Sequence, residues 1–212
     1  MQLVFYYDLT KDVENFTKST KSVNRKNYTE FQNLYTKING ENFDVEKIKH
    51  FIEEHIKTNK IDVEKEINSI RNKWLKIENV FIERAEKTFG IKYPAGTITV
   101  YLTNNERCTY NTQENYFFVK IGSQFSNNII MHEIFHFYTY YAFGKKLLED
   151  GIAKDLYNDI KESLTELLNI EFSDLMGGEI DKGYPQHQEM RGKIKKLWLK
   201  DRSIKNLIDE LL

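Results

Sequence analysis

One five-residue segment of the 212-residue chain combines side chains that can do metal chemistry. It reads HEIFH and supplies His132, Glu133 and His136. On an α-helix, residues four apart lie on one face, one turn above the other, so the two imidazoles can bind the same Zn²⁺. The glutamate beside the first histidine can accept a proton from a metal-bound water. The spacing therefore predicts two ligands of one catalytic zinc ion, with Glu133 as the general base.

Apolar residues flank this segment on both sides. They are Ile129, Ile130, Met131, Ile134, Phe135, Phe137 and Tyr138. Such flanks are typical of a helix buried in the middle of a domain, where polar groups are costly unless they are satisfied. A metal ion would satisfy both histidines. The alternative is an ordinary core helix in which neighbouring side chains satisfy them.

A catalytic zinc usually takes three protein ligands and leaves one position for water. The metzincin extension would need a glycine and a third histidine where the chain has Thr139 and Ala142, so that class is excluded. Farther on, Asp159, Glu162 and Glu166 follow at steps of three and four, which places three carboxylates on one face of a predicted helix. Without a metal, the same spacing would be an ordinary solvated acidic face.

The HEIFH segment is followed, after 25 intervening residues, by ESLTE (residues 162–166), and together they resemble the gluzincin pattern of thermolysin-like metallopeptidases. The resemblance implies that Glu162 is the third ligand. It also implies that Glu166 orients His132 or His136, a role in which a carboxylate sets the imidazole tautomer. Glu stands where the family usually has Asp, and no Asn precedes the ligand Glu. The resemblance covers residues 97–170 at most.

Asp159 remains the alternative third ligand or a further carboxylate supporting the site. An Asp ligand is known in aspzincins, but their GTxDxxYG signature is absent from this chain.

Two further features complete the expected site. Zincins place a strand at the sheet edge, upstream of the zinc helix, where it can pair with an extended substrate. Residues 116–121 (YFFVKI) are a candidate for this strand. The alternative is that they form an interior strand. Tyr184 and His187 lie at a loop-to-helix junction from which gluzincins supply an oxyanion-stabilising donor. The alternative for both is a capping or surface role.

The resemblance implies a zinc metallopeptidase that hydrolyses peptide bonds through a zinc-activated water, more in keeping with an endo- or oligopeptidase than with an exopeptidase. Its partner would be a peptide or protein substrate. Two alternatives are a catalytically inactive zincin-fold binding protein with structural metal, and a zinc hydrolase that acts on non-peptide amides. The pattern gives neither the cleavage preference nor the oligomeric state.

The composition excludes several classes of binding surface and metal site and indicates the location of the protein. The 31 basic and 32 acidic residues nearly balance, which argues against a nucleic-acid or anionic-membrane surface. Cys108 is the only cysteine, so no disulfide framework and no cysteine zinc site forms within one chain. The N-terminal residues have neither a basic region nor a long apolar run, and nothing reaches transmembrane length. The expectation is a cytoplasmic protein that does not bind membranes.

Residues 1–94 read as mainly helical after a short strand at residues 3–7. Asp44 is a predicted N-cap for a helix that ends near residue 58. Asp62 is the predicted cap of a single helix of about seven turns, which stops at Gly90. Apolar residues recur along it at steps of three and four.

After Pro94 the pattern changes to strands at residues 97–102 and 116–121, followed by helices. The predicted helices span residues 126–144, 150–170, 185–199 and 203–212. The expected fold class is α+β: mainly helical, with a small mixed sheet packed on the HExxH helix, zincin-like. The expected organisation is a helical region at 1–94 and a zincin-like catalytic region at 95–212, together forming one compact unit.

Overall fold

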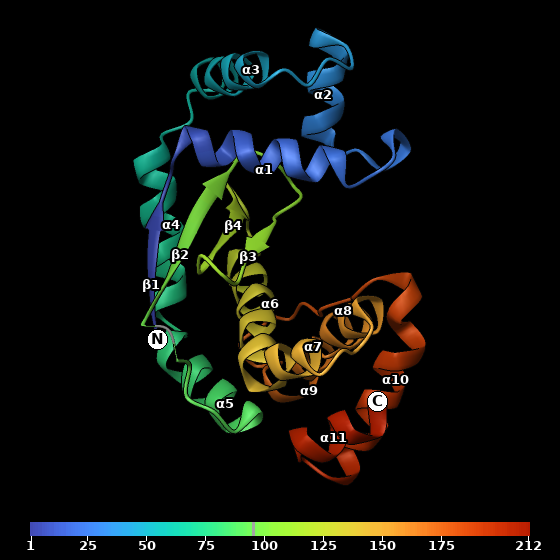
Figure 1. Ribbon diagram of the computed structural model, residues 1–212. Helices are drawn as coiled ribbons and strands as arrows, with labels where there is room; N and C mark the ends of the chain where they lie inside the picture. Colours follow the sequence, from blue (N-terminus) through green and yellow to red (C-terminus); the bar gives the residue numbers. More distant parts are fainter. Residues whose placement is uncertain (95) are drawn as a thin grey trace. The chain divides into compact units, whose positions relative to one another are not determined.

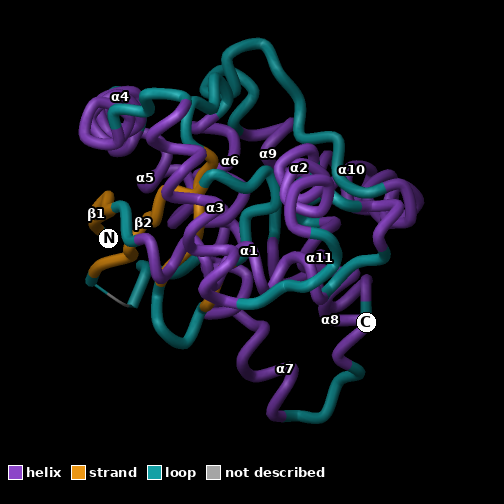
Figure 2. Tube along the Cα trace, turned by 90° about the horizontal axis from the view of Figure 1, so that it is seen from above, coloured by secondary structure: helices purple, strands orange, loops and turns teal. Residues whose placement is uncertain are grey.

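The computed structural model describes residues 1–94 and 96–212. Helices make up most of the described chain, and four short strands form one mixed sheet (Figures 1 and 2). The predicted α+β class, mainly helical with a small mixed sheet, is confirmed. No helix in the described ranges combines the length and apolar composition needed to cross a bilayer.

The chain folds into two compact units that are interleaved in sequence. The first, here called the sheet unit, comprises Gln2–Lys73 and Ala95–Ser126. The second, here called the site unit, comprises Met1, Trp74–Pro94 and Asn127–Leu212. The expected division at residue 94 therefore does not match these units, because residues on each side of it contribute to both.

The sheet has the strand order β1-β2-β4-β3. Its strands are β1 (Gln2–Tyr6), β2 (Thr97–Thr103), β3 (Tyr110–Asn111) and β4 (Tyr116–Lys120). β2 pairs in parallel with both β1 and β4, while β3 pairs antiparallel with the first two residues of β4. The predicted edge strand at residues 116–121 is thus an interior strand, since β2 and the short β3 flank it. Its run of buried side chains at Tyr116–Val119 shows that both faces of the strand are covered over these residues.

Four helices belong wholly or mainly to the sheet unit. They are α1 (Leu9–Lys21), α2 (Glu30–Asn39), α3 (Val45–Thr58) and α4 (Val63–Leu75), with a 3₁₀ turn at Arg25–Asn27. Asp44 caps α3 through the Lys47 amide as predicted, and Asp8 caps α1. In Figure 1, α1 lies across the ends of the strands. Aromatic rings of α1, α2 and α3 form a common core made of Phe16, Phe31, Tyr35 and Phe51.

Side chains, more than strand pairing, hold the segment between β2 and β3. The buried Asp12 carboxylate accepts hydrogen bonds from the Asn104 amide, the Asn104 side chain and the Thr103 hydroxyl. Buried Asn15 donates to Thr103 Oγ1 at 3.0 Å and accepts from the Thr109 amide at 3.1 Å. Because Asp12, Asn15, Thr103 and Asn104 are all buried, the network specifies one conformation of the segment.

The predicted seven-turn helix is two helices, α4 and α5 (Glu78–Phe89), separated at Lys76 and Ile77. The Trp74 indole donates to Glu78 Oε1 across this break at 3.0 Å. Apolar spacing continues through the break, which is why the periodicity indicated one helix. α5 ends as predicted at Gly90, whose φ of 68° lies in the left-handed region that glycine adopts without strain.

Candidate metal site

The HEIFH segment lies on α6 (Ser126–Thr139), within the site unit. Ile130, Met131, Ile134, Phe135, Phe137 and Tyr138 are fully buried, as the flanking pattern predicted. Beyond Thr139 the helix continues as a π-helical segment, Tyr140–Gly144, and then as α7 (Lys145–Glu149). The predicted helix over residues 126–144 is therefore present, with a wider last part.

The predicted acidic helix at residues 150–170 is interrupted. α8 (Lys154–Ser163) ends before a tight turn at Leu164 and Thr165, and α9 (Glu166–Glu171) follows. The Leu167 amide bonds the Leu164 carbonyl at 3.0 Å, three residues back, as in a 3₁₀ turn. The steps of three and four from Asp159 to Glu166 therefore do not describe one continuous helical face.

Three predicted ligands come together in the folded chain. One donor atom each from His132, His136 and Glu162 lies within 4.8 Å of the other two. Glu162 Oε2 is 3.8 Å from His132 Nε2, and Glu162 Oε1 is 3.6 Å from His136 Nε2. Zinc ligands with bonds of about 2.0–2.2 Å lie roughly 3.3–3.6 Å apart in a tetrahedron, so the two distances from Glu162 are within a few tenths of an ångström of those in a zinc site.

Asp181 orients His132, a role that the sequence assigned to Glu166. Its Oδ2 lies 2.6 Å from His132 Nδ1, which leaves Nε2 to face Glu162. Burial alone would raise the pKa of Asp181, but the hydrogen bond and charge of His132, together with Arg191 and Thr165, bring that pKa below its usual value. A carboxylate in this position sets the imidazole tautomer and its direction.

Asp181 is itself held on several sides. The Thr165 hydroxyl donates to Asp181 Oδ1 at 3.0 Å, and the Asn169 side chain makes two hydrogen bonds with the Asp181 backbone. Arg191, only 3% exposed, contacts Asp181 Oδ1 at 3.1 Å and Glu166 Oε2 at 2.8 Å. The assignment of Glu166 to a ligand histidine is wrong, because its carboxylate pairs with Arg191 and Asn169 instead.

The general base predicted at Glu133 is buried beside the ligands. Only 7% of the residue is exposed, and Oε2 has no hydrogen-bond partner in the described part of the chain. Burial raises the pKa of Glu133 to about 7, with His132 opposing that shift and Glu162 adding to it. A carboxylate with a pKa near neutrality is suited to accept and return a proton.

The two histidines differ in their electrostatic surroundings. Burial lowers the pKa of His136 well below its usual value, and the nearby charges of His132 and Lys161 add to the effect. Burial also opposes the charged form of His132, yet the hydrogen bond and charge of Asp181 raise its pKa overall. A neutral imidazole is the form that binds metal, so His136 is already in that form at neutral pH.

His187 and Tyr184 lie next to the ligand helix but outside the three-residue group. α8 supplies Asp159, whose Oδ1 is 3.1 Å from His187 Nε2. His187 is buried, and its Nδ1 has no hydrogen-bond partner among the described residues. Tyr184 is half exposed, with its ring 5.7 Å from that of His187. Among the described residues, Asp159 is not in the metal-ligand group; Glu162 is.

No pattern in the sequence pointed to Asp181 or Arg191. Asp181 lies on a loop between α9 and the next helix, where Gly177, Gly178 and Gly183 all have positive φ. Helical periodicity cannot place a loop residue. Arg191 lies on α10 (Gln188–Lys200), which begins after the 3₁₀ turn Pro185–His187 and confirms the helix predicted at residues 185–199.

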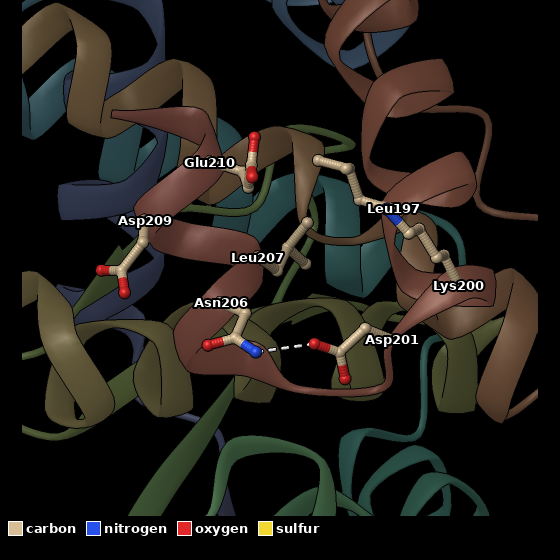
Figure 3. Close-up of a pocket in the computed structure, with 7 residues that line it drawn as sticks. All are labelled: Leu197, Lys200, Asp201, Asn206, Leu207, Asp209 and Glu210. Carbon is tan, nitrogen blue, oxygen red and sulfur yellow. Dashed lines mark hydrogen bonds between the residues drawn. The ribbon is translucent and has the colours of Figure 1, made fainter.

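Away from these residues, a hollow in the site unit has a volume of about 310 Å³ and lies between α10 and α11 (Ile204–Leu211). Figure 3 shows the residues that line it: Leu197, Lys200, Asp201, Asn206, Leu207, Asp209 and Glu210. The Asn206 side chain donates to Asp201 Oδ2 at 2.6 Å, so that carboxylate is already paired. This hollow contains none of the three candidate ligands.

In comparisons with known proteins, no family model, no curated protein sequence and no solved structure matches the chain.

Proposed function

We propose that the protein is a zinc-dependent peptidase. One observation carries the proposal: donor atoms of His132, His136 and Glu162 converge, with the buried carboxylate of Glu133 adjacent in sequence to the first of them. Two imidazoles and one carboxylate are a common ligand set of catalytic zinc, which leaves a fourth position open.

When bound, zinc would supply a Lewis acid and lower the pKa of a water molecule toward neutrality. The residues around it would do the rest. Asp181 holds His132 with Nε2 directed to the ligand group. Glu133 accepts the proton of the attacking water and then delivers it to the leaving amine.

His187 is the proposed donor to the oxyanion that forms at the peptide carbonyl. In the imidazolium form both ring nitrogens carry protons: Nε2 donates to Asp159 Oδ1, which orients the ring, and Nδ1 keeps a proton for the oxyanion. Tyr184, with its ring edge against His187, is the second candidate for the same role. Hydrogen bonds from such donors are worth most when they form only in the transition state.

The test combines metal content with turnover. Purified wild type is expected to contain about one zinc per chain and to cleave unstructured peptides. Glu133→Gln keeps the size of the side chain and all three ligands, so it should retain zinc and lose at least about a hundredfold in kcat. A wild type that binds no zinc below micromolar concentration would overturn the proposal.

An inactive binding protein with structural metal makes a different prediction. If the protein is such a binding protein, Glu133→Gln should be at least as stable as wild type and should bind zinc to the same extent, and neither protein should cleave peptides. Glu133 Oε2 is buried and has no hydrogen-bond partner among the described residues, which favours the catalytic assignment because a structural site has no need for such a costly group. A zinc hydrolase of non-peptide amides would instead show zinc-dependent turnover on small amides, with no cleavage across a peptide panel.

A further inference from the structure

Lys161 is a buried cation beside the candidate ligand Glu162. Only 6% of Lys161 is exposed, and its Nζ lies 2.8 Å from Glu162 Oε1. Lysine is rarely buried so far, because removing an ammonium from water is costly unless an opposite charge compensates. The HExxH mechanism gives this residue no role.

Lys161 contacts the same carboxylate that the two histidines face. Glu162 Oε1 is shared between Lys161 Nζ and His136 Nε2, while Oε2 faces His132 Nε2. A carboxylate oxygen has two lone pairs, so Oε1 can accept a hydrogen bond from the Lys161 ammonium and still bind a metal. The salt bridge therefore holds the Glu162 carboxylate in one orientation without removing it from the ligand group.

The charge of Lys161 also matters at this position. Glu133, Glu162 and Asp181 bring three carboxylates near His132. Arg191 pairs with Asp181, at one side of the group. Lys161 pairs with Glu162, at another side, and it also acts electrostatically on Glu133. Lys161 thus offsets negative charge at the ligand itself.

We propose that Lys161 is a positioning residue that acts through Glu162. It orients the ligand carboxylate and draws electron density from it, which weakens zinc binding and leaves the bound zinc a stronger Lewis acid. The inference rests on the proposed function and deepens it. Repulsion between an ammonium and a dication on one carboxylate exceeds the gain from one hydrogen bond, so the charge effect dominates the affinity.

The decisive variant is Lys161→Met, which keeps the length of the side chain and removes its charge. Zinc affinity is measured by competition with a chromophoric chelator. The turnover number kcat is measured with a peptide substrate. We expect zinc to bind at least tenfold more tightly and kcat to fall at least tenfold. Lys161→Arg keeps the cation and should stay within threefold of wild type in zinc affinity.

Two further variants separate charge from structure. Lys154→Met removes a charge from an exposed position on the same helix and should leave zinc affinity unchanged. Lys161→Gln keeps a hydrogen-bond donor without the charge, and it should also bind zinc more tightly; it serves as the readout if Lys161→Met does not fold.

The outcomes are distinguishable. A merely structural lysine predicts weaker or unchanged zinc binding in both Lys161→Met and Lys161→Gln, and either result overturns this inference while the zinc site stands. A wild type without zinc affinity overturns the proposed function, and the role of Lys161 with it.

Discussion

At the scale of single residues, a hydrogen bond joins the candidate ligand His132 to Asp181 on a loop. Asp181→Asn keeps the shape of the side chain but removes the charge that stabilises the imidazole orientation. Loss of such a carboxylate typically costs about 10–100-fold in metal affinity. We expect a drop of that size in a chelator competition assay. Glu179→Gln, at an exposed position on the same loop, should bind zinc as wild type does.

Glu14 gives a residue-scale prediction for acid stability. Burial would raise its pKa, but hydrogen bonds from Lys18, Lys11 and Tyr116 lower it to about 2. A lowered pKa stabilises the fold above the unfolded value near 4.5, and this stability is lost as the pH falls from there toward 2. Because the side chain is partly exposed, the effect is at most about 1 kcal/mol.

Glu14→Gln should therefore be less stable than wild type at pH 7, with the difference shrinking toward pH 2. Urea unfolding at several pH values measures this trend. A difference that stays constant between pH 7 and pH 2 would contradict the assignment.

Single residues were predictable where a regular element carried them. His132, Glu133 and His136 lie on one helix, so spacing alone indicated their chemistry. The structure also brings Glu162 to the two histidines. Asp181 lies on a loop without periodicity, and Glu166 was misassigned because the helix breaks at Leu164 and Thr165.

At the scale of helices and strands, the π-helical segment after α6 requires a glycine at position 144. A Cβ at Gly144 would lie 2.6 Å from the ring of Tyr157, which is buried and cannot move freely. Gly144→Ala should destabilise the protein by about 1–3 kcal/mol, the usual cost of overpacking. Thermal unfolding measures the loss. Gly192→Ala, on α10 with open space around it, should be neutral or stabilising by up to about 1 kcal/mol.

The loop that carries Asp181 offers a second pair of glycine variants. Gly183 has a φ of 59°, and a Cβ there would lie 2.7–2.8 Å from the Arg191 side chain. Gly183→Ala should displace Arg191 and thereby weaken both stability and zinc affinity. Gly177→Ala has similar backbone strain but open space. Gly177→Ala should therefore lower the stability but leave the zinc affinity unchanged. An equal loss of zinc affinity in the two variants would refute the role of Arg191.

Elements with clear caps were predicted well, and breaks within elements were not. Asp44 and Gly90 mark helix ends in the chain as they do in the pattern. The interruptions at Lys76–Ile77 and Leu164–Thr165 leave the apolar spacing intact, so nothing local distinguishes them from continuous helix. The strand β3 has only two residues, too few for a recognisable alternation.

At the scale of the whole molecule, the expected catalytic region 95–212 lacks part of its own core. Within the site unit, Phe81 and Phe89 of α5 pack against Phe135 of α6, and Phe81 also packs against Phe172. A fragment of residues 95–212 should therefore be largely unfolded and fail to bind zinc. A fragment of residues 74–212 retains these rings and should bind zinc more tightly than the shorter one. Circular dichroism and zinc titration of both fragments test this.

The parallel pairing of β1 with β2 has a consequence for the order of folding. Leu3 pairs with Ile98, so β1 leaves the ribosome about 95 residues before the strand it pairs with. Helices α1–α5 are synthesised in the interval, and local helical contacts form faster than pairings so distant in sequence. Sheet closure is thus a late event, and before it the β1 backbone is available to other chains.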